Sequence, residues 1–251
     1  MTTAAFLAAL VPALPACAVQ RVVSLNLCTD QLLVLLAPQK VAALSPLARD
    51  PALSFVAAQA RHLPVVRPSA EAVLRLHPDL VLATRYGAQT TVALLQQEGV
   101  HVVRAGLPQS FAGIRAQTRR LAARLGVPAR GEALLAAMDA TLAEAPQRRT
   151  HPTAIAWEPR GYTAGPGSLL DAVLQAAGLR DIASGRPLGV EALLRHPPDL
   201  LVVQQTPAYP SLATQMLHAP ALAGISRVAL PPALTVCAGP FTAQAVALLA
   251  R

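Results

Sequence analysis

Short, continuous apolar runs alternate along the chain with segments whose apolar residues recur at helical spacing. The apolar runs predict buried strands, and the spaced patterns predict helices that pack on them. The predicted strands are 21–25, 41–44, 80–83, 100–104, 153–157, 200–204 and 227–230. The predicted helices between them are 29–36, 69–76, 90–98, 168–177, 190–194 and 242–249. Because a strand that is apolar throughout is buried on both faces, the pattern predicts an α/β protein whose parallel sheets are covered by helices on both sides.

The middle of the chain has a different pattern. Two helical segments, 110–125 and 129–145, follow each other across Gly126-Val127-Pro128, with no strand signal between them. Since Gly and Pro end one helix and start the next, two consecutive helices are expected here. The sequence therefore predicts three parts after a leader. These are an N-terminal α/β lobe at 19–109, connecting helices at 110–149 and a C-terminal α/β lobe at 150–251.

An internal repeat supports the division into two lobes. Residues 69–83 read SAEAVLRLHPDLVLA and residues 189–203 read GVEALLRHPPDLLVV, an offset of 120 (189 minus 69). The informative matches are Glu71/Glu191, Arg75/Arg195, Pro78/Pro198 and Asp79/Asp199. Two unrelated helix–turn–strand units could match by coincidence, because Pro-Asp turns are common between such elements. The equivalent position of each copy in its half favours duplication of a lobe.

The first 18 residues have the features of an export signal. Residues 2–16 carry no charge, and Ala16-Cys17-Ala18 resembles a signal-peptidase site. The apolar stretch of about 11 residues is shorter than the ~20 needed to span a bilayer. We therefore expect 1–18 to be a signal peptide removed on export to the periplasm. Two alternatives are lipidation of Cys17 in a lipoprotein box and a helix of the mature fold, which Pro12 and Pro15 disfavour.

The composition narrows the classes of function that the chain could have. The chain is 53% apolar and 14% charged with a net charge of +8, and Lys40 is its only lysine. A nucleic-acid partner is disfavoured because like charges form no run and aromatic residues are only 3% of the chain. Common nucleotide, hydrolase and metal motifs are absent, so no catalytic residue, cofactor or metal site is assigned. The 165–168 turn, GPGS, could hold an anion and keeps a secreted α/β enzyme as an alternative.

Three segments together resemble a known family. They are RVVSLNLCTDQLL at 21–33, the paired units at 69–83 and 189–203, and Gly99-Val100-His101-Val102 before the long helices. Their order resembles that of periplasmic substrate-binding proteins of ABC importers for cobalamin and ferric siderophores. The resemblance implies a class III fold, in which a long, rigid backbone helix joins two parallel-sheet lobes and the ligand binds in the cleft between them.

The resemblance also implies partners. A monomer would capture a large metal chelate (cobalamin, ferric siderophore or haem) and deliver it to an inner-membrane ABC permease. Glu71 and Glu191, one in each lobe, match the glutamates that dock onto arginines of the permease. Each also falls in the first turn of its predicted helix, where a carboxylate stabilises the helix dipole by about 0.3 to 1 kcal/mol, which is a sufficient structural explanation. A ligand sensor without transport is a further alternative.

The candidate ligand site follows from the predicted sheets, because ligands of open parallel sheets bind beyond the carboxyl ends of the strands. The residues chosen there are Asn26, Cys28, Arg49, Arg85, Tyr86, Trp157, Arg160, Tyr162, Tyr209, Cys237 and Phe241. Aromatic rings would contact a large planar ligand, and arginines would neutralise its acidic groups. The structural alternatives are aromatic residues that cover the sheet ends and solvated loop arginines. Cys28 and Cys237 could form a disulfide, ligate a metal or pack as small apolar residues.

Overall fold

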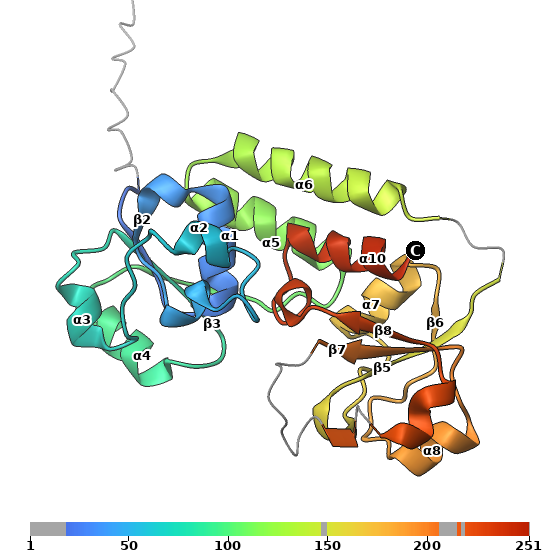
Figure 1. Cartoon of the computed structure of the whole chain (residues 1–251). Helices are drawn as coiled ribbons and strands as arrows, with labels where there is room; N and C mark the ends of the chain where they lie inside the picture. The colour runs from blue at the N-terminus through green and yellow to red at the C-terminus, as the bar shows by residue number, and fades with distance from the viewer. Residues whose placement is uncertain (1–18, 147–149, 206–214, 217–218, 251) are drawn as a thin grey trace, which may run out of the picture.

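Two four-stranded parallel sheets organise the protein (Figure 1). The computed structural model describes residues 19–146, 150–205, 215–216 and 219–250, so the predicted leader, Cys17 and Tyr209 lie outside the described residues. The first sheet contains β1 (Val22–Ser24), β2 (Val41–Ala43), β3 (Leu80–Thr84) and β4 (Val102–Ala105), in the order β2-β1-β3-β4. The second contains β5 (Thr153–Trp157), β6 (Arg180–Asp181), β7 (Leu200–Gln204) and β8 (Arg227–Leu230), in the order β6-β5-β7-β8. The two sheets therefore share one topology, and the predicted fold class is confirmed.

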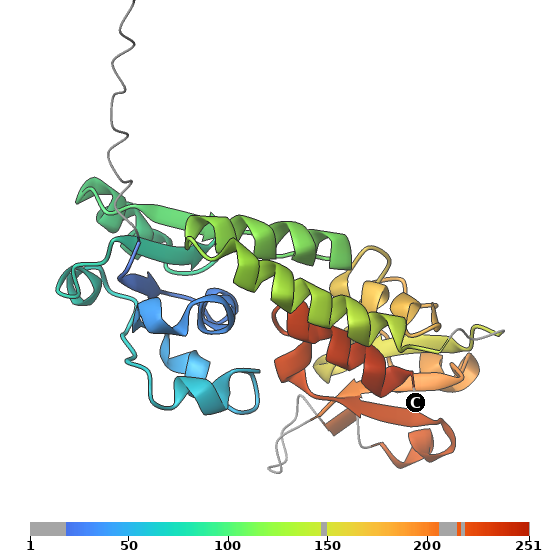
Figure 2. The same ribbon diagram turned by 90° about the horizontal axis from the view of Figure 1, so that it is seen from above.

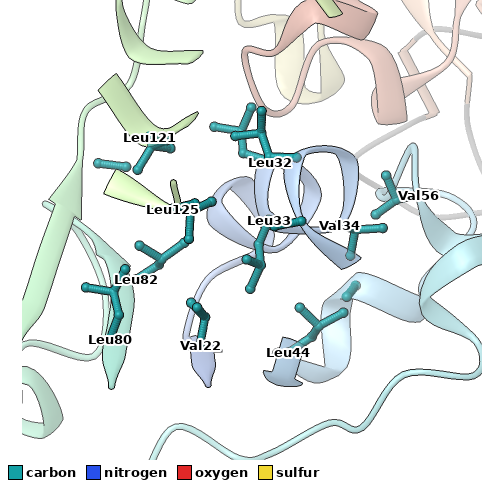
Figure 3. Packing of buried hydrophobic residues seen from close by; sticks show 14 of the residues in the cluster. Val22, Leu32, Leu33, Val34, Leu44, Val56, Leu80, Leu82, Leu121 and Leu125 are labelled. Carbon is teal, nitrogen blue, oxygen red and sulfur yellow. The ribbon is translucent and has the colours of Figure 1, made fainter. Parts of the chain in front are cut away.

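Helices cover both faces of each sheet, which explains why the strands are apolar at consecutive positions. In the N-terminal lobe these helices are α1 (Leu27–Leu36), α2 (Ala57–Ala60), α3 (Ala70–Leu74) and α4 (Gln89–Gln97). In the C-terminal lobe they are α7 (Leu169–Ala176), α8 (Val190–Arg195) and α10 (Ala243–Leu249). Val22 of β1 packs with Leu32 and Leu33 of α1 (Figure 3), whereas the next residue, Val23, packs with Val73 of α3 on the opposite face. Successive side chains of a strand point to opposite faces, so both faces are core.

The repeated Pro-Asp turns perform the same structural task in both lobes. In the N-terminal lobe, Asp79 Oδ2 accepts hydrogen bonds of 2.8 Å from the backbone N–H groups of Gln20 and Arg21, just before β1. In the C-terminal lobe, Asp199 Oδ2 accepts from the backbone N–H and the hydroxyl of Thr153, both at 2.7 Å, at the start of β5. These bonds lower the pKa of both carboxyl groups. The repeat thus ties together the amino ends of two central strands in each sheet.

Helices α5 (Phe111–Arg124) and α6 (Pro128–Ala143) connect the lobes and lie side by side along them (Figure 2). Gly131 permits their close approach, because a Cβ at this position would lie 2.6 Å from the Cβ of Ala122. Leu134 of α6 packs against the N-terminal core, while Met138, one turn later, packs with Ala243 of the C-terminal lobe. Helix α6 therefore spans the junction between the lobes.

Two short elements were not expected from the sequence. Helix α2 is a single turn in the segment after β2, and β6 consists of two polar residues at the edge of the second sheet. Neither is long enough to show a periodic pattern, and β6 is held through its pairing with β5. Within the described part of the chain, no helix is both long and apolar enough to cross a membrane.

Candidate functional site

The carboxyl ends of the two sheets meet at a disulfide bond. Cys28 lies in the first turn of α1, which follows β1, and Cys237 lies in the segment that follows β8. The two residues form a disulfide with a Cα–Cα distance of 5.1 Å and a sequence separation of 209. Of the three alternatives for this pair, the structure therefore shows the disulfide, and neither thiol is free to ligate a metal. The described residues also contain no cluster of three or more side chains suited to a metal ion.

A small apolar cluster surrounds the disulfide at the junction of the lobes. The rings of Phe55 and Phe241 stack with centroids 4.7 Å apart and an interplanar angle of 11°. Phe241 is only 4% exposed and Cys237 only 3%, and both pack with Leu27 of the other lobe. The sequence places Phe241 and Cys237 among the candidate ligand contacts, whereas in the structure contacts between the lobes cover both side chains.

Trp157 is also placed differently from the expectation. Its side chain is completely buried, and the indole N–H donates a 2.9 Å hydrogen bond to the carbonyl oxygen of Leu188. Trp157 shares one face of β5 with Ile155, and that face packs against Leu193 of α8. The last residue of the strand therefore belongs to the core, and packing accounts for Trp157 without a ligand.

Asn26 and Arg49 have structural partners. The Asn26 side chain is the N-cap of α1, where Oδ1 accepts a 2.9 Å hydrogen bond from the backbone N–H of Cys28. The Arg49 guanidinium donates to the carbonyl oxygens of Ala60 and Leu63, at 3.3 and 2.6 Å. These contacts give both residues a structural role. Asn26 caps α1, and Arg49 holds the segment that follows α2.

Four of the predicted residues lie in solvent at the carboxyl ends of the strands. Arg85 and Tyr86 follow β3, and Tyr86 is 63% exposed. Arg160 and Tyr162 follow β5, and Tyr162 is 54% exposed. The turn after β5 is tight, because Arg160 has a left-handed φ of 64° and a Cβ at Gly161 would lie 2.6 Å from a backbone oxygen.

The sequence interpretation missed other apolar residues at these ends. Nine large apolar side chains are exposed among the described residues, and six of them follow strand ends. The six are Leu47, Tyr86, Leu107, Tyr162, Ile182 and Val236. We call these residues except Ile182, together with Arg85 and Arg160, the carboxyl-edge surface; Ile182 is left out because β6 pairs with the start of β5. The rule that ligands bind beyond the carboxyl ends of the strands, the strand-end rule, would have found the two leucines and Val236 but not Ile182, whose strand was not predicted. An apolar residue in a sequence carries no sign that it is exposed.

A buried polar network lies behind this surface in the N-terminal lobe. Asp30 is fully buried, and its carboxyl group accepts hydrogen bonds from the hydroxyl (2.5 Å) and the backbone N–H (3.1 Å) of Ser45. Burial raises the pKa of Asp30 to about 7, although hydrogen bonds from Ser24 and Ser45 oppose the shift. Ser45 directly precedes the 3-10 turn Pro46–Arg49, which carries Leu47. The network therefore connects α1 to the turn that presents Leu47.

Two pockets lie outside the carboxyl-edge surface. An apolar pocket of about 200 Å³ occurs at the junction of the lobes, where its lining includes Leu35, Phe55, Leu134, Met138, Phe241 and Ala243. A more open pocket of about 400 Å³ lies beside β6 and is lined by His151, Asp171, Gln175, Leu179, Arg180 and Asp181.

The two candidate docking glutamates are exposed, one on each lobe. Glu71 lies in the first turn of α3 and pairs with Arg75 at 2.6 Å, and Glu191 lies in the first turn of α8. Helices α3 and α8 lie on different lobes, away from α6 (Figure 1). Both glutamates are therefore accessible to a partner, and both also occupy positions where a carboxylate favours the helix dipole.

Comparisons with known proteins agree with this architecture. The family described as periplasmic binding protein matches residues 22–229. Cobalamin-binding proteins from two strains of Halobacterium salinarum are 33% identical over 149 residues, which cover 53% of this chain but only 39% of each relative. The periplasmic heme-binding protein RhuT from Roseiflexus sp. RS-1, in apo form, is 26% identical with a TM-score of 0.72, over 92% of this chain and 97% of that one. A periplasmic heme-binding protein from Pseudomonas aeruginosa is 26% identical with a TM-score of 0.73, over 92% and 91%. The chain belongs to the periplasmic binding protein family.

Proposed function

We propose that this chain is the substrate-binding component of an ABC importer and acts as a monomer outside the cytoplasm. It binds a large metal chelate, which is cobalamin, a ferric siderophore or haem, between its lobes and docks on a membrane permease. The observation that carries the proposal is the carboxyl-edge surface, where exposed apolar and aromatic side chains and two arginines follow strands of both sheets. Binding involves no covalent step.

The chemistry of this surface suits such a ligand. Tyrosine rings offer flat apolar contact area at a small cost in conformational entropy, and guanidinium groups bind carboxylates or phosphate. The disulfide between Cys28 and Cys237 joins the segments that follow β1 and β8, so a ligand beside it can contact both lobes. The relatives described as cobalamin-binding and heme-binding support the same class of ligand.

The test is a titration with hemin, cyanocobalamin and ferrichrome, followed by the absorbance of the chelate and by calorimetry. Fluorescence of Trp157 is a poor reporter, because the indole is buried and hydrogen-bonded to backbone. We expect Tyr86→Ala and Tyr162→Ala each to weaken binding of the chelate by about 10-fold. Leu94→Ala is the matched control, because Leu94 is an exposed apolar residue away from the strand ends. Absence of binding to all three chelates, or equal losses in the control, would contradict the proposal.

The arginines are tested in the same way. We expect Arg85→Gln and Arg160→Gln to weaken binding of an acidic chelate such as hemin and to reduce its dependence on ionic strength. Arg124→Gln is the control, since Arg124 is exposed in the last turn of α5 and not at a strand end. An unchanged salt dependence in both test variants would remove the arginines from the site.

Docking requires a separate measurement of transport. We expect Glu71→Arg and Glu191→Arg to abolish uptake through the permease and to leave the affinity for the chelate unchanged. Glu98→Arg makes the same charge change at an exposed position beyond the end of α4 and should leave uptake intact. Normal uptake with both test variants would show that these glutamates serve only their own helices.

A further inference from the structure

We propose that the Cys28–Cys237 disulfide is a clamp that fixes the distance between the carboxyl ends of the two sheets and so presets the ligand site. Its effect on ligand affinity rests on the proposed function. Its effect on the spacing of the lobes depends only on the geometry of this chain.

The position of the bond is the first argument. Cys28 immediately precedes the buried turn of α1 that holds Asp30, and Cys237 lies four residues before Phe241 in the stacked pair. Each cysteine is thus anchored to the structure of its own lobe. A disulfide tolerates Cα–Cα distances of about 4.4 to 6.8 Å. With 5.1 Å observed, the two edges can separate here by no more than about 2 Å while the bond is intact.

The second argument is that the bond adds a separate attachment to the helical bridge. Helix α6 already contacts both lobes, through Leu134 on one side and Met138 on the other. The apolar pocket of about 200 Å³ lies between α6 and the stacked rings of Phe55 and Phe241. Each lobe is therefore attached both at α6 and at the disulfide, with the pocket between them. It cannot rotate freely about either attachment.

The third argument is that the apolar cluster around the bond is small. In this apolar cluster only Leu27, Cys237 and Phe241 are fully buried, and Phe55 and Leu35 are only partly buried. The pocket beside the cluster opens to solvent, so the lobes bury little apolar surface against each other at that place. The covalent bond therefore limits the separation of the edges more strictly than this small cluster alone.

The consequence concerns binding. A site whose two halves are already at the correct distance loses less conformational entropy when the ligand binds. The intact disulfide thus gives tighter binding and slower dissociation than two lobes joined by α5 and α6 alone. When the bond is reduced, the two lobes can separate, and the ligand must bring them together as it binds.

The experiment compares the wild type with Cys28→Ala/Cys237→Ala. We expect small-angle X-ray scattering of the ligand-free double variant to show a larger maximum dimension and a broader distance distribution. For whichever of hemin, cyanocobalamin or ferrichrome the wild type binds, we expect affinity to fall at least 5-fold, with most of the change in the dissociation rate. Leu193→Ala is the control for lost stability, because Leu193 is buried in the C-terminal lobe away from the junction. It should lower the melting temperature and leave scattering and affinity unchanged.

If the double variant does not fold, dithiothreitol treatment of folded wild type well below its melting temperature gives the same comparison, and reoxidation should restore the original scattering. A folded variant or reduced protein with wild-type scattering and affinity would overturn the clamp. If the wild type binds none of the three chelates, the proposed function fails, whereas the ligand-free scattering still decides whether the disulfide sets the spacing of the lobes.

Discussion

At the amino ends of their strands the two lobes have the same aspartate contact. At the carboxyl ends the chain continues differently in each lobe. In each lobe an aspartate of the repeated turn, Asp79 or Asp199, holds the start of the central strand. At the other end, β1 leads directly into the Asn26 N-cap and α1, whereas β5 leads into the left-handed turn at Arg160.

This difference separates residues with a structural role from residues of the proposed ligand site. After β1 the polar groups turn inward, where Asp30 and Ser45 form a buried network. After β5 the core is closed by Trp157, and the chain then turns outward to expose Arg160 and Tyr162. Residues at the amino edge are therefore expected to matter mainly for folding, whereas residues of the carboxyl-edge surface are expected to matter mainly for the ligand.

The largest expected effect is a difference in the free energy of unfolding between variants of Trp157 and of Tyr162, which follows in the next turn. Trp157→Ala leaves a cavity in the C-terminal core and should lower the free energy of unfolding by about 3–5 kcal/mol. Tyr162→Ala should change it by less than about 0.5 kcal/mol, since the ring is exposed. Chemical denaturation of both variants provides the measurement, and equal losses would show that the end of β5 is not divided into core and surface.

The buried network of the N-terminal lobe predicts a pH dependence. The pKa of Asp30 is about 7 in the folded protein, above the ordinary 3.8. The folded state therefore binds more protons between these values, and stability should decrease as pH rises from about 4 through 7. The full shift corresponds to at most about 4 kcal/mol. Melting temperatures from pH 5 to 8 should decline in the wild type and change less in Asp30→Asn. An equal slope in the two proteins would assign the dependence to other groups.

A smaller effect should be shared by the two lobes. Asp79→Asn and Asp199→Asn each remove a charge-assisted contact at the start of a central strand, at an exposed position. We expect similar and modest decreases in melting temperature, without loss of ligand binding. Because both carboxyl groups have a lowered pKa, their contribution should disappear as pH falls below about 4. A large effect in one lobe alone would contradict the equivalence of the two turns.

The smallest effect concerns the candidate docking residues. Glu71→Gln and Glu191→Gln should each change the free energy of unfolding by less than about 1 kcal/mol, because exposed ion pairs and helix-dipole contacts are weak. Glu71 loses its pair with Arg75, so its change should be the larger of the two. Thermal melts at low and high salt measure the difference. A loss above 1 kcal/mol would favour a structural role over docking.

Much of the fold could be predicted because its signals are local. The continuous apolar strands, the Pro-Asp turns and the Gly-Val-Pro break at 126–128 each require only neighbouring residues. The strand β6 could not be predicted in this way, because its two polar residues are held by pairing with β5. For the candidate site, the sequence rule selected both exposed and buried residues. The strand-end rule located Tyr86 and Tyr162, but it also selected Trp157 and Phe241, which tertiary contacts bury.

The sequence by itself determined the order of the longer strands and helices, the repeated helix–turn–strand unit and the segments that follow the predicted strands, because hydrophobic period and turn chemistry are properties of adjacent residues. Only the tertiary structure decided which of those segments face solvent and which residues meet across 209 positions of chain. Cysteine composition left three outcomes open for Cys28 and Cys237, and the choice among them depended on the distance between their Cα atoms. The packing of α5, α6 and both cores brings the two cysteines close enough to bond, which no local pattern encodes.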